Sequence, residues 1–215
     1  MMQRLYGLNK WILFTTLTLA TVYFTWLMNA ALPFEQMMYS SLSEQLSANR
    51  IEKLIENQQK WQWLSYAIVP VLLLIKWLLV AVVLDIGALF LEIELKFKKA
   101  FHIAMLSEVV FIVLLATKFG WFFYHRDILT LEYVQFFMPL SLGNVIDISF
   151  MDKWLVYPLQ VFNVFEMVYW LTLAYFLHLE IKQSFWKSFH FVAITYGVGL
   201  VVWLTFIAFL ILNFN

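Results

Sequence analysis

Five charged side chains lie inside long apolar stretches of this sequence, and their chemistry needs an explanation. They are Lys76, Asp85, Glu108, Lys118 and Glu166. A charge inside a lipid bilayer is costly, so such residues usually face protein or water and mark sites for ions, protons or substrates. Lys76 and Glu166 fall near the middle of their stretches and have opposite charges. Their depths match at about 1.5 Å per helical residue, which predicts an ion pair across the bundle.

Two further carboxylates, Asp85 and Glu108, fall on the two arms of a predicted helical hairpin. Each lies roughly two turns from the cytoplasmic end of its arm. Two carboxylates held close together cannot both ionise easily, so this pair could share one proton. Lys118 lies close enough to the outer face for its flexible side chain to reach the headgroups.

Helical spacing also predicts a polar stripe in the fourth apolar stretch. Gln160, Asn163 and Glu166 are three residues apart and would share one face of a helix, with Pro158 one turn earlier. Such a stripe could hold the bundle together through hydrogen bonds, with Lys76 as a partner. It could instead line a route for protons, ions or a small solute, or contact another subunit within the membrane.

In the second of these interpretations the carboxylates of Asp85, Glu108 and Glu166 would be the carriers. The candidate polar cluster in the membrane is therefore made of six residues, whose role is either binding or structural. They are Lys76, Asp85, Glu108, Gln160, Asn163 and Glu166.

Motifs for metal binding or soluble catalysis are missing from the sequence. His102, His178 and His190 map near two inner hairpin turns, but a metal site would need them to converge with a carboxylate. They are weak candidates, and we predict no metal and no cofactor. The chain has no cysteine, which excludes disulfides and thiol catalysis. No HExxH, P-loop, GxSxG or GxGxxG pattern is found, so a non-enzymatic role is expected.

The elements that must position these residues are five apolar stretches. They cover about 11–32, 64–91, 101–124, 154–178 and 190–212. Each exceeds the roughly 20 residues that a helix needs to cross a bilayer. The chain is 63% hydrophobic and 13% charged, against about 45–50% and 25% in soluble domains. These values predict an all-α, polytopic membrane bundle of five helices, forming a single domain over 1–215.

Basic residues set the expected orientation of the bundle. With the N-terminus inside, the cytoplasmic pieces are 1–10, 92–100 and 179–189, where Lys and Arg are dense. The outer pieces, 33–63 and 125–153, carry most of the acidic residues. The positive-inside rule therefore predicts an N-inside, C-outside topology.

The two outer pieces differ in sequence pattern: one is amphipathic and the other is a loop with helix-breaking residues. Residues 34–60 form an amphipathic segment that predicts two short helices. These helices could lie on the outer leaflet, cover the mouth of the bundle or bind a partner. The outer loop 125–153 contains Pro139 and Gly143 and is expected to pack on the outer ends of the third and fourth spans.

Parts of the sequence resemble a known family. The segments YPLQVFNVFEMVYWLTLAYFL (157–177) and SFWKSFHFVAITYG (184–197) are similar to the membrane domain of the Yip family, five-span proteins named for binding Ypt/Rab GTPases. The segments KFKKAFHIAMLSEVVFIV (96–113) and PLSLGNVI (139–146) resemble the bacterial branch. The resemblance covers about two thirds of the chain and implies five spans, N-inside and C-outside, in a bacterial inner membrane.

One departure from the family limits what it implies. Eukaryotic members carry a long cytosolic N-terminal region that takes part in trafficking, whereas only about ten residues precede the first apolar stretch here. Rab binding and vesicle trafficking are therefore not carried over to this chain.

These observations favour a non-enzymatic accessory or scaffold subunit of a bacterial membrane assembly, for example in export or envelope biogenesis. Its expected partners are the lipid bilayer and a membrane protein or second copy, with no nucleic acid. The alternative is a small proton-coupled transporter or permease that uses the intramembrane carboxylates. A third hypothesis, a lipid-modifying enzyme, would have to use the three inner histidines.

Overall fold

The computed structural model describes residues 7, 9–126, 129–146 and 151–214. Within these ranges the chain forms helices and no strand. Five helices are long and apolar enough to cross a membrane: Lys10–Ala31, Ala48–Phe90, Phe97–Tyr124, Val164–Ile181 and Phe185–Phe214. The prediction of an all-helical chain with five apolar helices of spanning length is therefore confirmed. The boundaries and continuity of these helices differ from the prediction in three places.

The first difference concerns the amphipathic segment 34–60. Its first half is a separate helix, α3 (Phe34–Leu42), which follows α2 (Lys10–Ala31) after a short bend. Its second half is not a separate helix, because α4 (Ala48–Phe90) runs without interruption for 43 residues. A helix of that length extends about 64 Å, roughly twice the thickness of the hydrocarbon core. The predicted outer helix and the second span are one element.

The third span is interrupted at a charged residue. It consists of α5 (Phe97–Ser107) and α6 (Val109–Tyr124), which meet at Glu108. The Glu108 N–H donates to Met105 O, three residues earlier, at 3.1 Å. This tighter turn interrupts the regular α-helical ladder and aims the Glu108 side chain into the bundle.

The fourth span is broken in two. The predicted helix 154–178 is divided into α8 (Lys153–Val161) and α9 (Val164–Ile181), with Phe162 and Asn163 between them. The outer loop pairs with this break, because Leu142 N–H donates to Phe162 O at 3.0 Å and Val164 N–H donates to Leu140 O at 3.2 Å. The loop thus satisfies backbone groups that the break leaves open.

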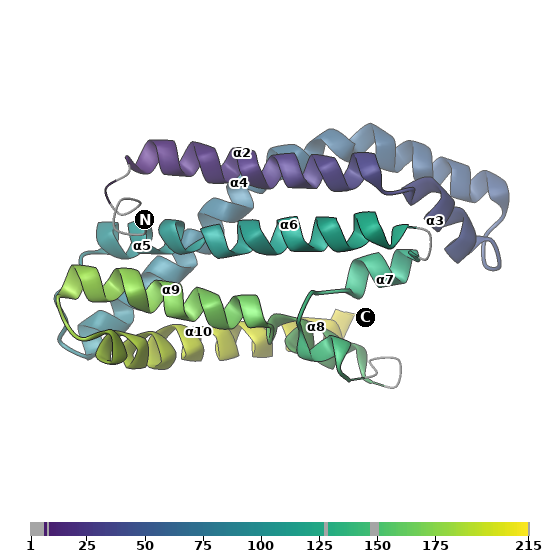
Figure 1. Ribbon diagram of the computed structural model, residues 1–215. Helices are drawn as coiled ribbons and strands as arrows, with labels where there is room; N and C mark the ends of the chain where they lie inside the picture. Colours follow the sequence, from purple (N-terminus) through teal and green to yellow (C-terminus); the bar gives the residue numbers. More distant parts are fainter. Residues whose placement is uncertain (1–6, 8, 127–128, 147–150, 215) are drawn as a thin grey trace.

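The remaining elements surround this broken span. The outer loop contains α7 (Leu131–Phe136) and the 3₁₀ turn η2 (Leu142–Asn144). The last helix, α10 (Phe185–Phe214), returns beside α9 as an antiparallel hairpin (Figure 1). In the same view α4 runs behind α2 and then crosses the bundle toward that hairpin.

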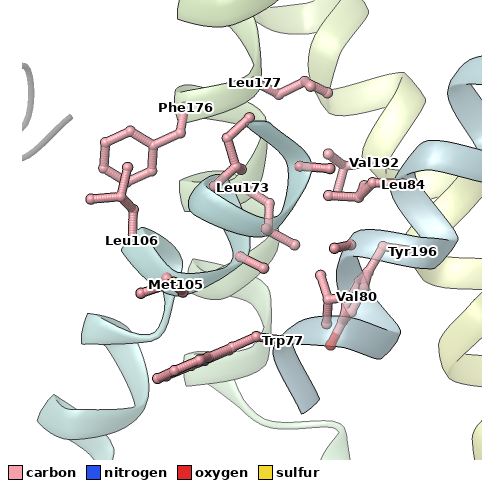
Figure 2. Close-up of a cluster of buried hydrophobic side chains, with 14 of the residues drawn as sticks. Trp77, Val80, Leu84, Met105, Leu106, Leu173, Phe176, Leu177, Val192 and Tyr196 are labelled. Carbon is pink, nitrogen blue, oxygen red and sulfur yellow. The ribbon is translucent and has the colours of Figure 1, made fainter. Parts of the chain in front are cut away.

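The core lies where α4, α5, α9 and α10 meet (Figure 2). Side chains of all four helices interdigitate there, and the labelled ones are Trp77, Val80, Leu84, Met105, Leu106, Leu173, Phe176, Leu177, Val192 and Tyr196. Small residues allow the helices to approach closely: a Cβ on Gly197 would lie 2.9 Å from Trp170 Cη2, and one on Gly199 would lie 3.0 Å from Val83 Cγ1. These two glycines therefore permit close packing of α10 against its neighbours.

Candidate functional site

A buried polar network lies beside this core, and its first half is built around Glu108. Lys76 Nζ lies 2.8 Å from Glu108 Oε1, and Trp77 Nε1 donates to Glu108 Oε2 at 3.0 Å. The Glu108 side chain is only 4% exposed, so both of its oxygens are satisfied within the protein. The predicted pairing of Lys76 with Glu166 is therefore wrong.

The position of Lys76 is fixed by rings as well as by the carboxylate. Its ammonium lies 3.4 Å from the ring centroid of Phe111 and 5.5 Å from that of Tyr169. A cation over an aromatic face is attracted by the ring quadrupole. The Lys76 side chain is nevertheless 34% exposed, whereas the neighbouring Trp77 is fully buried. The Lys76 side chain is thus the part of this half that remains accessible.

The second half of the network is built around Glu166, in the first turn of α9. Asn163 caps this helix, and its Oδ1 accepts from the Glu166 N–H at 2.9 Å. A carboxylate in this first turn is favoured by the helix dipole. Glu166 Oε1 also accepts from Trp170 Nε1 and from the Tyr196 hydroxyl, each at 2.9 Å. A helix start and two aromatic donors therefore stabilise Glu166.

The predicted stripe on one helix face does not exist, because the helix breaks within it. Gln160 is on α8, Asn163 is the cap of α9 and Glu166 is inside α9. Gln160 Nε2 donates to the Phe136 carbonyl, and Asn163 Nδ2 donates to the Gln160 carbonyl. The two amides hold the outer loop and the break together, and only Glu166 belongs to the network.

Tyr169 lies between the two halves. Its ring centroid is 4.8 Å from that of Phe111 and 5.5 Å from that of Tyr196. The residue is fully buried, and its hydroxyl finds no hydrogen-bond partner among the described residues. A buried hydroxyl without a partner costs free energy, so among the described residues of this network Tyr169 is the one with an unsatisfied polar group.

Asp85 lies apart from the network. It is half-buried on α4, and no ion pair or hydrogen bond joins it to another described residue. The predicted carboxylate pair with Glu108 is not formed, since Glu108 is occupied by Lys76 and Trp77. Lys118 is half-buried on α6, with its ammonium 5.4 Å from the ring centroid of Phe122. Its reach to the outer headgroups stays a prediction.

The inner histidines are not assembled into a site. Among the described residues no group of three His, Cys, Asp or Glu side chains could hold a metal ion. His178 packs edge-on against Tyr175 and Phe185, and His190 is exposed on α10. The hypothesis of a histidine-based enzyme site therefore gains no support from the geometry.

The sequence reasoning missed the aromatic donors that complete the network. The indoles of Trp77 and Trp170 each donate an N–H to a carboxylate. The spacing from Glu166 to Trp170 is four residues, at which helical side chains meet, so that contact was open to prediction. The contact of Glu166 with Tyr196 joins separate helices and has no signal in the sequence.

No protein family, curated protein or solved structure matches the chain. The chemistry of the network therefore has to be argued from its own geometry. Its two carboxylates are held by one ammonium, two indoles, one phenol and a helix start, which is a way of keeping charge inside an apolar bundle.

Proposed function

We propose that the chain is a non-enzymatic accessory or scaffold subunit of a bacterial membrane assembly, such as one for export or envelope biogenesis. The observation that carries the proposal is the continuity of α4. Residues 48–63 precede the predicted second span and prolong it by about 24 Å. The helix therefore forms a projection that would begin at the outer headgroups and extend beyond them.

The projection is held in place by α3. Met37 on α3 and Ile51 on α4 are buried, and Gln59 Nε2 donates to Glu35 Oε1 at 2.7 Å between the two helices. An adjacent side of α4 remains open, with Leu54 and Trp61 exposed there. These two residues are seven positions apart, so they share one helix face. A fixed helix pair with an exposed apolar face is suited to binding another protein.

The polar network supports the same proposal. The oxygens of Glu108 and Oε1 of Glu166 are occupied by protein donors. Hydrogen bonds of this kind hold membrane helices together. We therefore assign the network to the stability of the bundle and the projection to its function.

We also propose the N-inside, C-outside orientation, the bacterial inner membrane and the relationship to the Yip family. The distribution of basic residues and the segment similarities support these three points. In this orientation the α3–α4 projection faces the outside, and the hairpin turns before α5 and α10 face the cytoplasm.

The test is to cross-link and purify the full chain from its native membrane in mild detergent. We expect a membrane-protein partner at fixed stoichiometry that is lost in Leu54→Ser/Trp61→Ser. The control Leu89→Ser/Phe90→Ser changes two even more exposed apolar residues at the other end of α4 and should keep the partner. Recovery of a lone chain from cross-linked membranes would refute the proposal.

A second candidate, a proton-coupled transporter, is favoured by one observation. Two of the spans are interrupted, and each interruption lies at or near a buried carboxylate, Glu108 or Glu166. Interrupted helices at binding sites are common in secondary transporters. This candidate requires that Glu166→Gln abolishes proton flux into liposomes while the thermal unfolding temperature is unchanged. Loss of stability without any flux in the unaltered chain would exclude it.

A further inference from the structure

A polar cleft lies outside the network, at the bend between α2 and α3. It has a volume of about 330 Å³ and is closed on one side by the projecting part of α4. That volume falls at the lower end of the range typical of small-ligand sites. Its polar walls are made of Asn29, Glu35, Gln36, Gln58, Gln59 and Gln62.

The chemistry of these walls is unusual for a surface cleft. Five of the six polar side chains are amides, and no Lys, Arg or His is among the described residues that line it. An amide offers donors and acceptors side by side, whereas phosphate and carboxylate ligands call for cationic partners. A ligand that itself both donates and accepts, as a hydroxyl group does, fits these walls best.

Two of the polar groups are already oriented by the protein. Gln59 Nε2 donates to Glu35 Oε1 at 2.7 Å, which leaves Gln59 Oε1 and Glu35 Oε2 available as acceptors. Asn29 Nδ2 donates to the Tyr66 hydroxyl at 3.2 Å, so Asn29 Oδ1 is available as well. Orientation before binding reduces the entropy that a ligand must overcome.

The cleft also has an apolar side, formed by Leu32, Phe34 and Ile55 among others. A sugar ring has the matching composition, because its hydroxyls lie around the rim and its C–H groups cover the faces. Asn29 is close to the end of α2, so the cleft lies where that helix would leave the bilayer. A sugar attached to a lipid headgroup would be at this level.

We propose that this cleft binds a neutral sugar ring, carried either by a glycolipid headgroup or by a free saccharide. The amides of Gln58 and Gln62 on α4 bind ring hydroxyls, together with the oriented acceptors of Asn29 and Glu35. The inference concerns ligand binding and is independent of the proposed subunit role.

The test uses the full chain in nanodiscs, which avoids detergents with sugar headgroups. Three lipid compositions are compared: phosphatidylglycerol alone, phosphatidylglycerol with glucosyl diacylglycerol, and phosphatidylglycerol with phosphatidylethanolamine. Lipid retention is measured by native mass spectrometry after release, and free maltose is titrated by calorimetry in phosphatidylglycerol discs. We expect preferential retention of the glucosyl lipid if the sugar belongs to a glycolipid headgroup. We expect saturable binding of maltose if it is a free saccharide.

The matched variants are Gln58→Ala/Gln62→Ala and the control Asn57→Ala, an exposed neighbour that does not line the cleft. The double variant should weaken sugar binding at least tenfold, and the control should leave it unchanged. Circular dichroism and the unfolding temperature check that all variants fold. Equal retention of all three lipids with no maltose binding, retention of phosphatidylethanolamine alone, or sugar binding that survives the double variant would each overturn the proposal.

Discussion

The ion pair between Lys76 and Glu108 can be tested by a double-mutant cycle. Lys76→Met removes a charge-assisted hydrogen bond of 2.8 Å and an ammonium–ring contact of 3.4 Å to Phe111. Breaking a buried pair from one side costs about 3–5 kcal/mol. The Lys76 side chain is 34% exposed, so we expect the lower end, about 3 kcal/mol.

The second single variant, Glu108→Gln, should lower the free energy of unfolding by less. Glu108→Gln keeps the shape of the side chain and an acceptor for Trp77, so it should cost about 2 kcal/mol, the value of one hydrogen bond to a charged group. Both single variants lose the same bond, which the double variant cannot lose twice. The double variant should therefore be about 3 kcal/mol less stable than the unaltered chain rather than 5, which is a coupling of about 2 kcal/mol.

The assay is reversible unfolding by sodium dodecyl sulfate in mixed micelles, followed by tryptophan fluorescence. Lys118→Met provides the matched control, because Lys118 forms no ion pair with any described residue. It should show no coupling with Glu108→Gln. Additivity of Lys76→Met and Glu108→Gln to within about 0.5 kcal/mol would refute the assigned pair. A larger coupling of Lys76→Met with Glu166→Gln would restore the pairing predicted from depth alone.

Three further predictions concern the same bundle. Gly197→Ala should lower the free energy of unfolding by about 1–3 kcal/mol, since its Cβ would press on the indole that binds the second carboxylate; Gly120→Ala, with nothing within 4 Å of its Cβ, should be neutral or stabilising by up to about 1 kcal/mol. Tyr169→Phe should be neutral or stabilising because it removes a hydroxyl without a partner, whereas Tyr196→Phe should cost about 1–2 kcal/mol for its lost bond to a carboxylate; the reverse order would contradict the network. Asn163→Ala should cost about 1 kcal/mol through the lost helix cap, measured by the same unfolding assay.

Apolar length was sufficient to predict five helices that are long and apolar enough to cross a membrane, because a bilayer sets the length that a spanning helix needs. Apolar length was not sufficient to predict where a helix is interrupted. The break at Phe162 and Asn163 depends on pairing with the distant loop residues Leu140 and Leu142, and such a tertiary contact leaves no mark on local periodicity. The polar composition of 48–60 likewise predicted that this segment lies outside the bilayer, but it did not show where the helix begins, because α4 continues through it.

Three of the six predicted cluster residues belong to the network, but their partners were not predicted. Lys76, Glu108 and Glu166 were selected because charge in an apolar stretch is rare, and all three belong to the network. Matching depths paired Lys76 with Glu166, but depth specifies only one coordinate, and the lateral order of helices decides which groups meet. In the structure α4 packs closely on α5, which places Lys76 beside the interruption at Glu108.

The continuity of α4 also has a mechanical consequence. One continuous helix connects the outer cleft, at Ile55 and Gln62, to the ion pair at Lys76, and Pro70 lies between them. Proline removes a backbone hydrogen bond, which makes this point the natural pivot of a helix. The arm from Ala48 to Pro70 is about 33 Å long, so a rotation of roughly 5° about Pro70 would move its tip by about 3 Å. A load on the outer arm would therefore be taken up by rotation at Pro70, before it reaches the charged centre of the bundle.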